Sequence, residues 1–221
     1  MIEIRGYAVP FNRTRHIASA GHVEVFDHEA FADMIGASVP LVWDSHDEAA
    51  PELGRATLFA DEYGLAFFAA VDMERHRGRI AAMTRKQNPA DQCSIGGLRI
   101  LSDRSDVVRG ISCQRITKAS IDHVAIVDDA AYGKATAAWP THDSLDHAPW
   151  RIQELAARWD KAHALYQLET RRSWLVATAD VIAARVDGPG GELSDKQLKL
   201  VKSTAALVAA VDRQIANLRT N

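Results

Sequence analysis

The spacing of apolar residues changes once along this chain, near residue 140, and that change constrains the fold most. Before it, apolar residues alternate with polar ones or gather in short runs between turn signals, which is typical of β-strands. After it, they recur every three and four residues, which is the spacing of one face of an α-helix. We therefore predict an α+β protein whose first part is mainly β and whose second part is helical.

The first part, residues 1–138, is expected to form one domain of short strands with one or two helices. The alternation of Ile2, Ile4 and Tyr7 predicts the opening strand, and residues 53–60 and 65–71 predict a hairpin around the turn 61–64. A helix is expected over 73–87. Further strands are expected over 41–43, 94–101, 107–116 and 121–127.

Residues 139–149 contain the prolines and small polar residues of a linker, and residues 150–221 carry the helical pattern. The run Gly188-Pro189-Gly190-Gly191 interrupts that pattern, and Ser194 followed by Gln197 matches a capping box that starts a second helix. An antiparallel helical hairpin is the expected result. Its apolar stripe must pack against its own domain or against another chain, and we expect self-association.

Composition excludes several classes of protein. The chain has 221 residues and a net charge of -3 without a long basic stretch, so no nucleic-acid partner is expected. No run of about 18 apolar residues and no signal-peptide pattern occurs, so we expect neither a membrane span nor secretion. Cys93 and Cys113 are too few for a disulfide framework and fit a reducing cytoplasm, although one disulfide stays possible.

Two polar residues stand in contexts that suit catalysis. Ser94 comes shortly before Gly96 and Gly97, and glycines behind a hydroxyl let the backbone approach a substrate and leave N–H groups for an oxyanion. His46 follows the expected strand 41–43, where a loop can face solvent. Taken alone, each is more often a turn serine or a surface histidine. Cys93 is a rival nucleophile that would need a lowered thiol pKa.

A third candidate is His123, in the β-type run 121–127. Because side chains alternate along a strand, Ile121, His123 and Ala125 should share one face, while Asp122 and Val124 point the other way. Only one of His123 and Asp122 can therefore face a given site.

These segments occur in an order that resembles the prohead proteases of tailed bacteriophages, a family related to the herpesvirus assemblins. The resemblance covers residues 2–135 and is carried by Gly6-Tyr7-Ala8-Val9-Pro10-Phe11-Asn12, Glu24-Val25-Phe26, Ala30-Phe31, His46-Asp47, Leu53-Gly54-Arg55, Gly64-Leu65, Cys93-Ser94-Ile95-Gly96-Gly97, His123-Val124-Ala125-Ile126-Val127 and Ala131-Tyr132. Many phage members have Glu where His123 stands, and a Ser and a Pro where Ala125 and Ala130 stand. A histidine at the third position is similar to the Ser-His-His arrangement of the assemblins.

The resemblance implies a small assemblin-like barrel with flanking helices and a serine endopeptidase activity without cofactor. It implies Ser94 as nucleophile, His46 as general base and His123 as the residue that orients the base, with Asp122 as the alternative. The implied substrates are the major capsid protein, its scaffolding segment and the protease itself, inside an immature capsid in the cytoplasm of a bacterial host. Backbone N–H groups near Gly96, or Arg115, would hold the oxyanion.

Two other functions stay open from the sequence. Ala125, Ala130 and the long helical tail also fit a catalytically inactive, protease-like scaffold or capsid assembly factor. Alternatively, His46 and His123 with Asp47 or Asp122 would make a zinc site if the fold brought them together.

Overall fold

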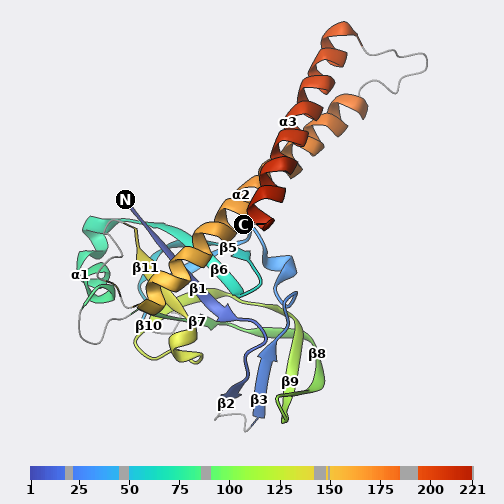
Figure 1. The fold of residues 1–221 in the computed structure, drawn as a ribbon. Helices are drawn as coiled ribbons and strands as arrows, with labels where there is room; N and C mark the ends of the chain where they lie inside the picture. Colours follow the sequence, from blue (N-terminus) through green and yellow to red (C-terminus); the bar gives the residue numbers. More distant parts are fainter. Residues whose placement is uncertain are drawn as a thin grey trace. The chain divides into compact units, whose positions relative to one another are not determined.

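The computed structural model describes residues 1–17, 22–44, 50–85, 91–141, 148, 150–184 and 194–220, which form two compact units, Met1–Trp159 and Asp160–Asn221. The first unit is mainly β, and the second consists of two helices (Figure 1). The expected α+β class is confirmed. The strands are β1 (Ile2–Pro10), β2 (Arg15–Ile17), β3 (His22–Phe26), β4 (Ser38–Trp43), β5 (Glu52–Ala60), β6 (Gly64–Val71), β7 (Gln92–Gly96), β8 (Arg99–Val108), β9 (Ile111–Ser120), β10 (His123–Val127) and β11 (Ala137–Pro140).

Among the described residues these strands form two sheets. The larger has seven strands in the order β11-β1-β6-β5-β4-β10-β7, and the smaller has four in the order β2-β3-β9-β8. The larger sheet bends back on itself, because β7 at one end contacts β1 and β11 at the other, and the Ala138 N–H donates to the Asp91 carbonyl. The result is a nearly closed, barrel-like sheet.

One face of the larger sheet forms the core of the first unit. Alternate residues of successive strands are buried there, among them Ile4, Leu41, Leu58, Phe67 and Val124. Burying side chains of this size contributes about 1.5–3 kcal/mol each, so the inward face is the principal source of stability. Side chains on the opposite face of the same strands do not enter this core and can make other contacts. The helix α1 (Met73–Met83) adds Ile80 and Met83 to this core.

The hairpin expected over 53–71 is confirmed as β5 and β6, which pair in antiparallel register. Its turn forms because the Asp61 carboxylate accepts hydrogen bonds from the N–H groups of Tyr63 and Gly64. The expected helix over 73–87 is confirmed in α1, which is capped by Asp72 and ends at Met83.

Two expected strands were placed wrongly. The strand expected over 94–101 is divided at Gly97, whose φ of +62° turns the chain from β7 in one sheet into β8 in the other. The strand expected over 107–116 is interrupted by the turn at Arg109 and Gly110, which have φ values of 52° and 80°. β-type residues flank both turns, so the alternation pattern alone did not mark them.

The expected linker lies largely outside the described residues, which exclude 142–147 and 149. Its first residues, Trp139 and Pro140, belong to β11 and pair with β1. The helix α2 (Trp150–Ala184) follows, and its start belongs to the first unit. Trp159 is fully buried there, with its indole N–H donating to the Phe67 carbonyl at 3.1 Å.

The second unit contains the rest of α2 and α3 (Asp195–Thr220). Ion pairs join Arg172 to Asp212 and Glu169 to Arg219. Because the earlier residue of α2 pairs with the later residue of α3, the two helices run antiparallel. The capping box is confirmed, because Ser194 and Gln197 exchange hydrogen bonds between side chain and backbone. The expected break at residues 188–191 lies outside the described residues. No helix of the described chain is long and apolar enough to cross a membrane.

Candidate active site

Ser94 lies in the middle of β7, and its surroundings are set by the pairing of β7 with β10. In this antiparallel ladder Ser94 is directly opposite Ala125, and Gly96 is directly opposite His123. Residues opposite one another share a face of the sheet, as do residues two apart on one strand. Ser94, Gly96, His123 and Ala125 therefore lie on the same face.

That face is opposite the one that enters the core cluster, and it is partly covered, because Gly96 and Ala125 are themselves buried. Cys93, Val124 and Ile126, which alternate with them along the two strands, belong to the core cluster, and Ile95 packs against it. Ser94 and His123 are both half-buried. Diagonal neighbours in such a ladder have Cα atoms roughly 7–8 Å apart and remain within reach of long or aromatic side chains. Gly96 places no side chain between them.

The alternation expected for the run 121–127 holds within β10. It fails only at Ile121, which lies before the strand. His123 and Ala125 face away from the core, and Val124 and Ile126 face into it. Ile121 precedes the strand and is buried in the core, so it does not share a face with His123 as expected. The turn before β10 rotates the chain and breaks the two-residue period.

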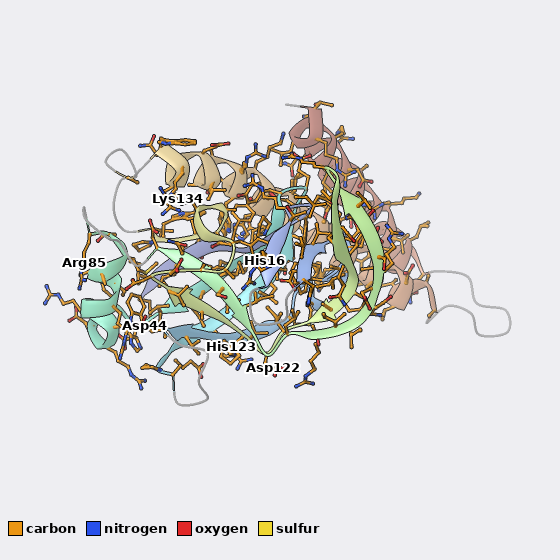
Figure 2. The ribbon with its side chains drawn as sticks, turned by 90° about the horizontal axis from the view of Figure 1, so that it is seen from below. His16, Asp44, Arg85, Asp122, His123 and Lys134 are labelled. Carbon is orange, nitrogen blue, oxygen red and sulfur yellow. The ribbon has the colours of Figure 1, made fainter. Side chains whose placement is uncertain are left out.

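Asp122 lies in that turn and bonds to Arg99 and to Gly96. Its carboxylate forms an ion pair with Arg99 at 3.1 Å, and its N–H donates to the Gly96 carbonyl. It also lies close over Gly97, where an added Cβ would be 2.5 Å from the Asp122 Cβ. Asp122 and His123, labelled in Figure 2, follow one another at the start of β10, whereas Asp44 lies at the other end of that strand, beside Ile126. The contacts of Asp122 are thus with Arg99 and Gly97.

His46 and Asp47 lie outside the described residues, but both strands that flank them are defined. β4 runs parallel to β10, with Trp43 opposite Ile126, and the Asp44 N–H donates to the Ile126 carbonyl. The Trp43 N–H donates to the Pro51 carbonyl, so the chain leaves and re-enters the sheet at one place. The chain therefore leaves the sheet at the end of β4, beside Ile126 of β10, and re-enters it at β5 on the other side of β4.

Cys93 is unsuited to act as the nucleophile. Its side chain is 1% exposed and belongs to the core cluster, on the face opposite that of Ser94. Burial raises the pKa of the Cys93 thiol well above its ordinary value, so the reactive thiolate is strongly disfavoured. Cys93 and Cys113 are both free thiols.

The electrostatics of His123 favour a neutral imidazole. Burial lowers the pKa of His123 from its ordinary value, and the negative charge of Asp122 opposes this shift only in part. A neutral imidazole offers one N–H donor and one nitrogen acceptor. It can orient a neighbouring group by hydrogen bonding, but it supplies no charge.

Arg115 was one candidate for stabilising the oxyanion. It lies on β9 of the smaller sheet, where its guanidinium has two side-chain partners. It pairs with the carboxylate of Asp106 and donates to the Asn12 side chain at 2.7 Å. In the described chain no three His, Cys, Asp or Glu side chains are grouped as a metal site requires.

The polar contacts that hold the start of β7 are not marked by any pattern in the sequence. Asp91 precedes this strand and forms an ion pair with Arg151, sixty positions later on α2, in which Nη2 of Arg151 contacts both carboxylate oxygens. Thr136 accepts a hydrogen bond from the Cys93 N–H. No local pattern marks such partners, because their separation in sequence is set by the fold alone.

A family model described as caudovirus prohead serine protease matches residues 1–149. Solved structures of the protease of Kaposi's sarcoma-associated herpesvirus are similar at 16% identity. One, in complex with a dimer disruptor, covers 70% of this chain and 81% of that chain with a TM-score of 0.39. Another, in complex with a hexapeptide phosphonate inhibitor, covers 94% and 96% with a TM-score of 0.40. Comparison with curated protein sequences gives no match.

Proposed function

Because the chain belongs to the caudovirus prohead serine protease family, we propose that it is an endopeptidase that cleaves capsid and scaffold proteins during prohead maturation, with Ser94, His46 and His123 as its triad. The observation that carries this proposal is the placement of Ser94 and His123 on one face of the β7–β10 ladder, outside the core. A hydroxyl and an imidazole gathered on an outer face meet the first requirement of nucleophilic catalysis.

The reaction proceeds in two halves. Ser94 Oγ attacks the scissile carbonyl carbon while His46 takes the hydroxyl proton, and the collapse of the tetrahedral intermediate breaks the C–N bond. His46 returns the proton to the leaving amine. Water then attacks the acyl-enzyme with His46 again as base, which releases the acid product and restores Ser94.

The lengths of the chain segments are compatible with this role for His46. His46 is three positions after Trp43, and three extended residues span at most about 11 Å. Trp43, Ile126 and Cys93 lie in one row across three strands. Adjacent strands are about 4.8 Å apart, so Ser94 lies roughly 10 Å from Trp43. A loop of this length allows an imidazole to reach the Ser94 hydroxyl.

His123 is proposed to orient His46 rather than to stabilise its charge. The serine-protease template assigns the third residue to holding the tautomer of the base and to stabilising the imidazolium. A neutral His123 performs the first task and supplies no negative charge for the second. Asp122 is the less favoured third member, because its carboxylate is held by Arg99.

We propose that the protease acts inside the immature capsid, on the major capsid protein, on its scaffolding segment and on itself. The helical unit supports a second part of this proposal, self-association. In the described part of this unit, Leu175, Val211 and Ile215 form a buried cluster, and Leu165, Leu168 and Val208 pack against it partly buried, which is a small core for two helices of this length.

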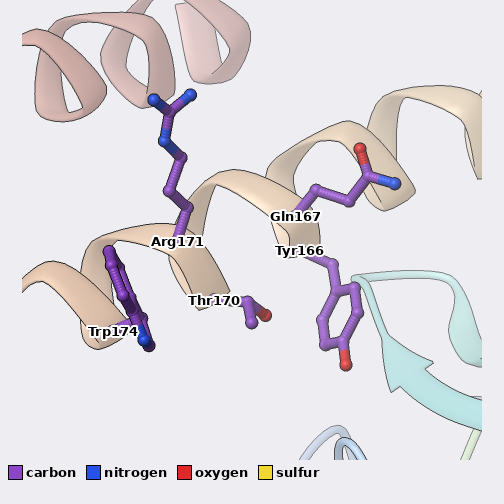
Figure 3. A pocket seen from close by; sticks show the side chains of 5 residues that line it. All are labelled: Tyr166, Gln167, Thr170, Arg171 and Trp174. Carbon is purple, nitrogen blue, oxygen red and sulfur yellow. The ribbon is translucent and has the colours of Figure 1, made fainter.

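Large apolar side chains are left on the outside of the helical unit. Trp174 and Val181 are exposed seven residues apart on α2, and Leu200 and Leu207 are exposed seven residues apart on α3. An open hollow beside Trp174 is lined by Tyr166, Gln167, Thr170 and Arg171 (Figure 3). Seven-residue spacing is the repeat by which helices pack into bundles, which suits a second copy of the hairpin.

A fluorophosphonate probe tests the catalytic proposal, because it reacts only with an activated serine. We expect covalent labelling of the wild-type protein at Ser94, no labelling of Ser94→Ala or His46→Ala, and unchanged labelling of the matched control Ser102→Ala. The cleavage of purified capsid protein should follow the same order. A folded wild-type protein that neither labels nor cleaves, and whose Ser94→Ala variant still supports prohead maturation, would instead be an inactive scaffold or assembly factor.

A further inference from the structure

A buried polar network ties the start of α2 to the strand that carries Ser94. Nη2 of Arg151 lies 2.5 and 2.6 Å from the two carboxylate oxygens of Asp91. Nη1 of the same guanidinium donates to the Thr136 carbonyl at 3.4 Å. Arg151 therefore holds the residue before β7 and the residue before β11 at the same time.

Thr136 extends this network to β7 itself. Its hydroxyl accepts a hydrogen bond from the Cys93 N–H at 3.1 Å and donates to the Gly133 carbonyl. The Ala138 N–H donates to the Asp91 carbonyl at 2.8 Å. The backbone of β7 is thus held at Asp91 and Cys93, the latter being the residue directly before Ser94.

The place of β7 in the sheet makes this network important. In the described part of the chain, β7 stands at one end of the seven-strand order, and β10 is the only strand that pairs with it in a ladder. A central strand has its position fixed from both sides, whereas an end strand has one free edge. Along the edge of β7 that lacks a paired strand, the side chains of Thr136 and Arg151 and the hydrogen bond from the Ala138 N–H take the place of a ladder.

The ion pair is buried: Asp91 is 4% exposed as a residue, and the side chain of Arg151 is 16% exposed. A buried pair is weak evidence for stability, because desolvation of the two charges offsets their attraction. It does impose a definite geometry, because the planar guanidinium directs Nη2 to both oxygens of Asp91 and Nη1 to the Thr136 carbonyl at the same time. Loss of Arg151 would leave the Asp91 charge buried without its counter-charge.

We propose that Arg151 is a positioning residue for the nucleophile, which fixes β7 through Asp91 and Thr136 and thereby sets the place of Ser94. The inference rests on the proposed role of Ser94. It assigns a part in the active site to a residue beyond the segment 1–149 that the family model matches. The start of α2 is then a component of the protease domain rather than only the beginning of a tail.

The test compares full-length wild type with Arg151→Met, which keeps an unbranched side chain but removes the charge and the donors. Hydrogen exchange followed by mass spectrometry reports on β7 without reference to catalysis. We expect faster exchange in the peptide that covers residues 92–96 and unchanged exchange in β5 and β6. Fluorophosphonate labelling of Ser94 should slow by about ten-fold or more, because small displacements of a reacting group are costly. Peptide cleavage should lose kcat with little change in KM.

Two further variants separate positioning from simple loss of structure. Arg158→Met removes a guanidinium from the same helix that lies 3.8 Å from Glu154 and 5.6 Å from the centre of the Tyr63 ring, neither of which belongs to β7, and should leave labelling unchanged. Arg151→Lys retains the charge beside Asp91 but lacks a second nitrogen for the Thr136 carbonyl, so it should restore labelling in part. All rates are measured well below the unfolding temperature of each variant and referred to the folded fraction.

Unchanged exchange in 92–96 together with labelling within about two-fold of wild type would overturn the proposal. It would also fail if exchange rose uniformly over the first unit while labelling per folded molecule stayed the same, because Arg151 would then have a structural role only. A wild-type protein that does not label at Ser94 would refute the proposed catalysis, and the exchange result would still decide whether Arg151 anchors β7.

Discussion

Ser94 and His123 are diagonal neighbours on the outward face of the β7–β10 ladder, with only Gly96 opposite the histidine. The arrangement brings together residues from two strands that are separated in sequence by the whole β8–β9 hairpin. It also separates the two candidates for the third member, because Asp122 lies in the turn and pairs with Arg99.

Replacing His123 with alanine should weaken catalysis less than replacing Ser94. A neutral third residue orients the base but contributes no charge, so we expect His123→Ala to retain more than about a tenth of wild-type peptide cleavage, a loss of less than about 1.4 kcal/mol in barrier. Steady-state kcat/KM on a capsid-derived peptide measures this. A loss as complete as that of Ser94→Ala would contradict the assigned role.

The pKa of His123 should lie below that of an exposed histidine, because burial disfavours its charged form. The folded state then binds this proton less readily than the unfolded state, so stability is complete above about pH 6.5 and declines as the pH falls below that value. NMR titration of the imidazole measures the pKa directly. In Asp122→Asn it should fall further, because the carboxylate raises it; a rise would show that the carboxylate acts otherwise.

Gly97→Ala should destabilise the protein more than Gly110→Ala. Both glycines have positive φ, which costs an alanine roughly 1–2 kcal/mol, but only at Gly97 would the added Cβ also collide with Asp122. At Gly110 no heavy atom lies within 4 Å of that position. Urea unfolding of both variants provides the comparison. Equal losses would mean that Asp122 moves aside at little cost.

Trp159→Ala and Trp174→Ala should affect different properties. Trp159 is buried against Phe59 and Phe68 and donates to the Phe67 carbonyl, so its loss should cost about 3–5 kcal/mol of unfolding free energy. Trp174 is 65% exposed, so its truncation should leave thermal stability nearly unchanged and weaken self-association. Calorimetry and light scattering over a concentration series measure the two effects. A monomeric wild type at all concentrations would argue against hairpin-mediated association.

The stability defect of Arg151→Met should shrink in acid. Burial raises the pKa of Asp91 and Arg151 opposes that shift, so removing the guanidinium should raise the pKa further. Above this pKa the variant carries an unpaired buried charge, which costs about 3–5 kcal/mol. As the pH falls through it, Asp91 becomes neutral and the penalty disappears. The difference in melting temperature from wild type, followed from neutral to acid pH, should therefore narrow; a constant difference would show that charge is not the cause.

The sequence identified many of the components but not all of their boundaries. Alternation marked β1, the turn containing Gly64 marked the hairpin of β5 and β6, and a run of β-type residues marked β10. The period of three and four marked the helical hairpin, and Ser194 with Gln197 marked the start of its second helix. The turn at Gly97 escaped notice, because its requirement comes from a positive φ and from Asp122 packed above it, not from the residues beside it.

The same division applies to the candidate site. The sequence by itself determined which residues have the chemistry: a serine before glycines, a histidine after a strand and a histidine within one. Only the tertiary structure decided that Ser94 and His123 share an outward face, that Asp122 is held by Arg99, and that Arg151 reaches back to Asp91. Local periodicity reflects which face of an element is buried. The register between strands and the partner of a buried charge depend on contacts between residues far apart in the chain, which no local pattern contains.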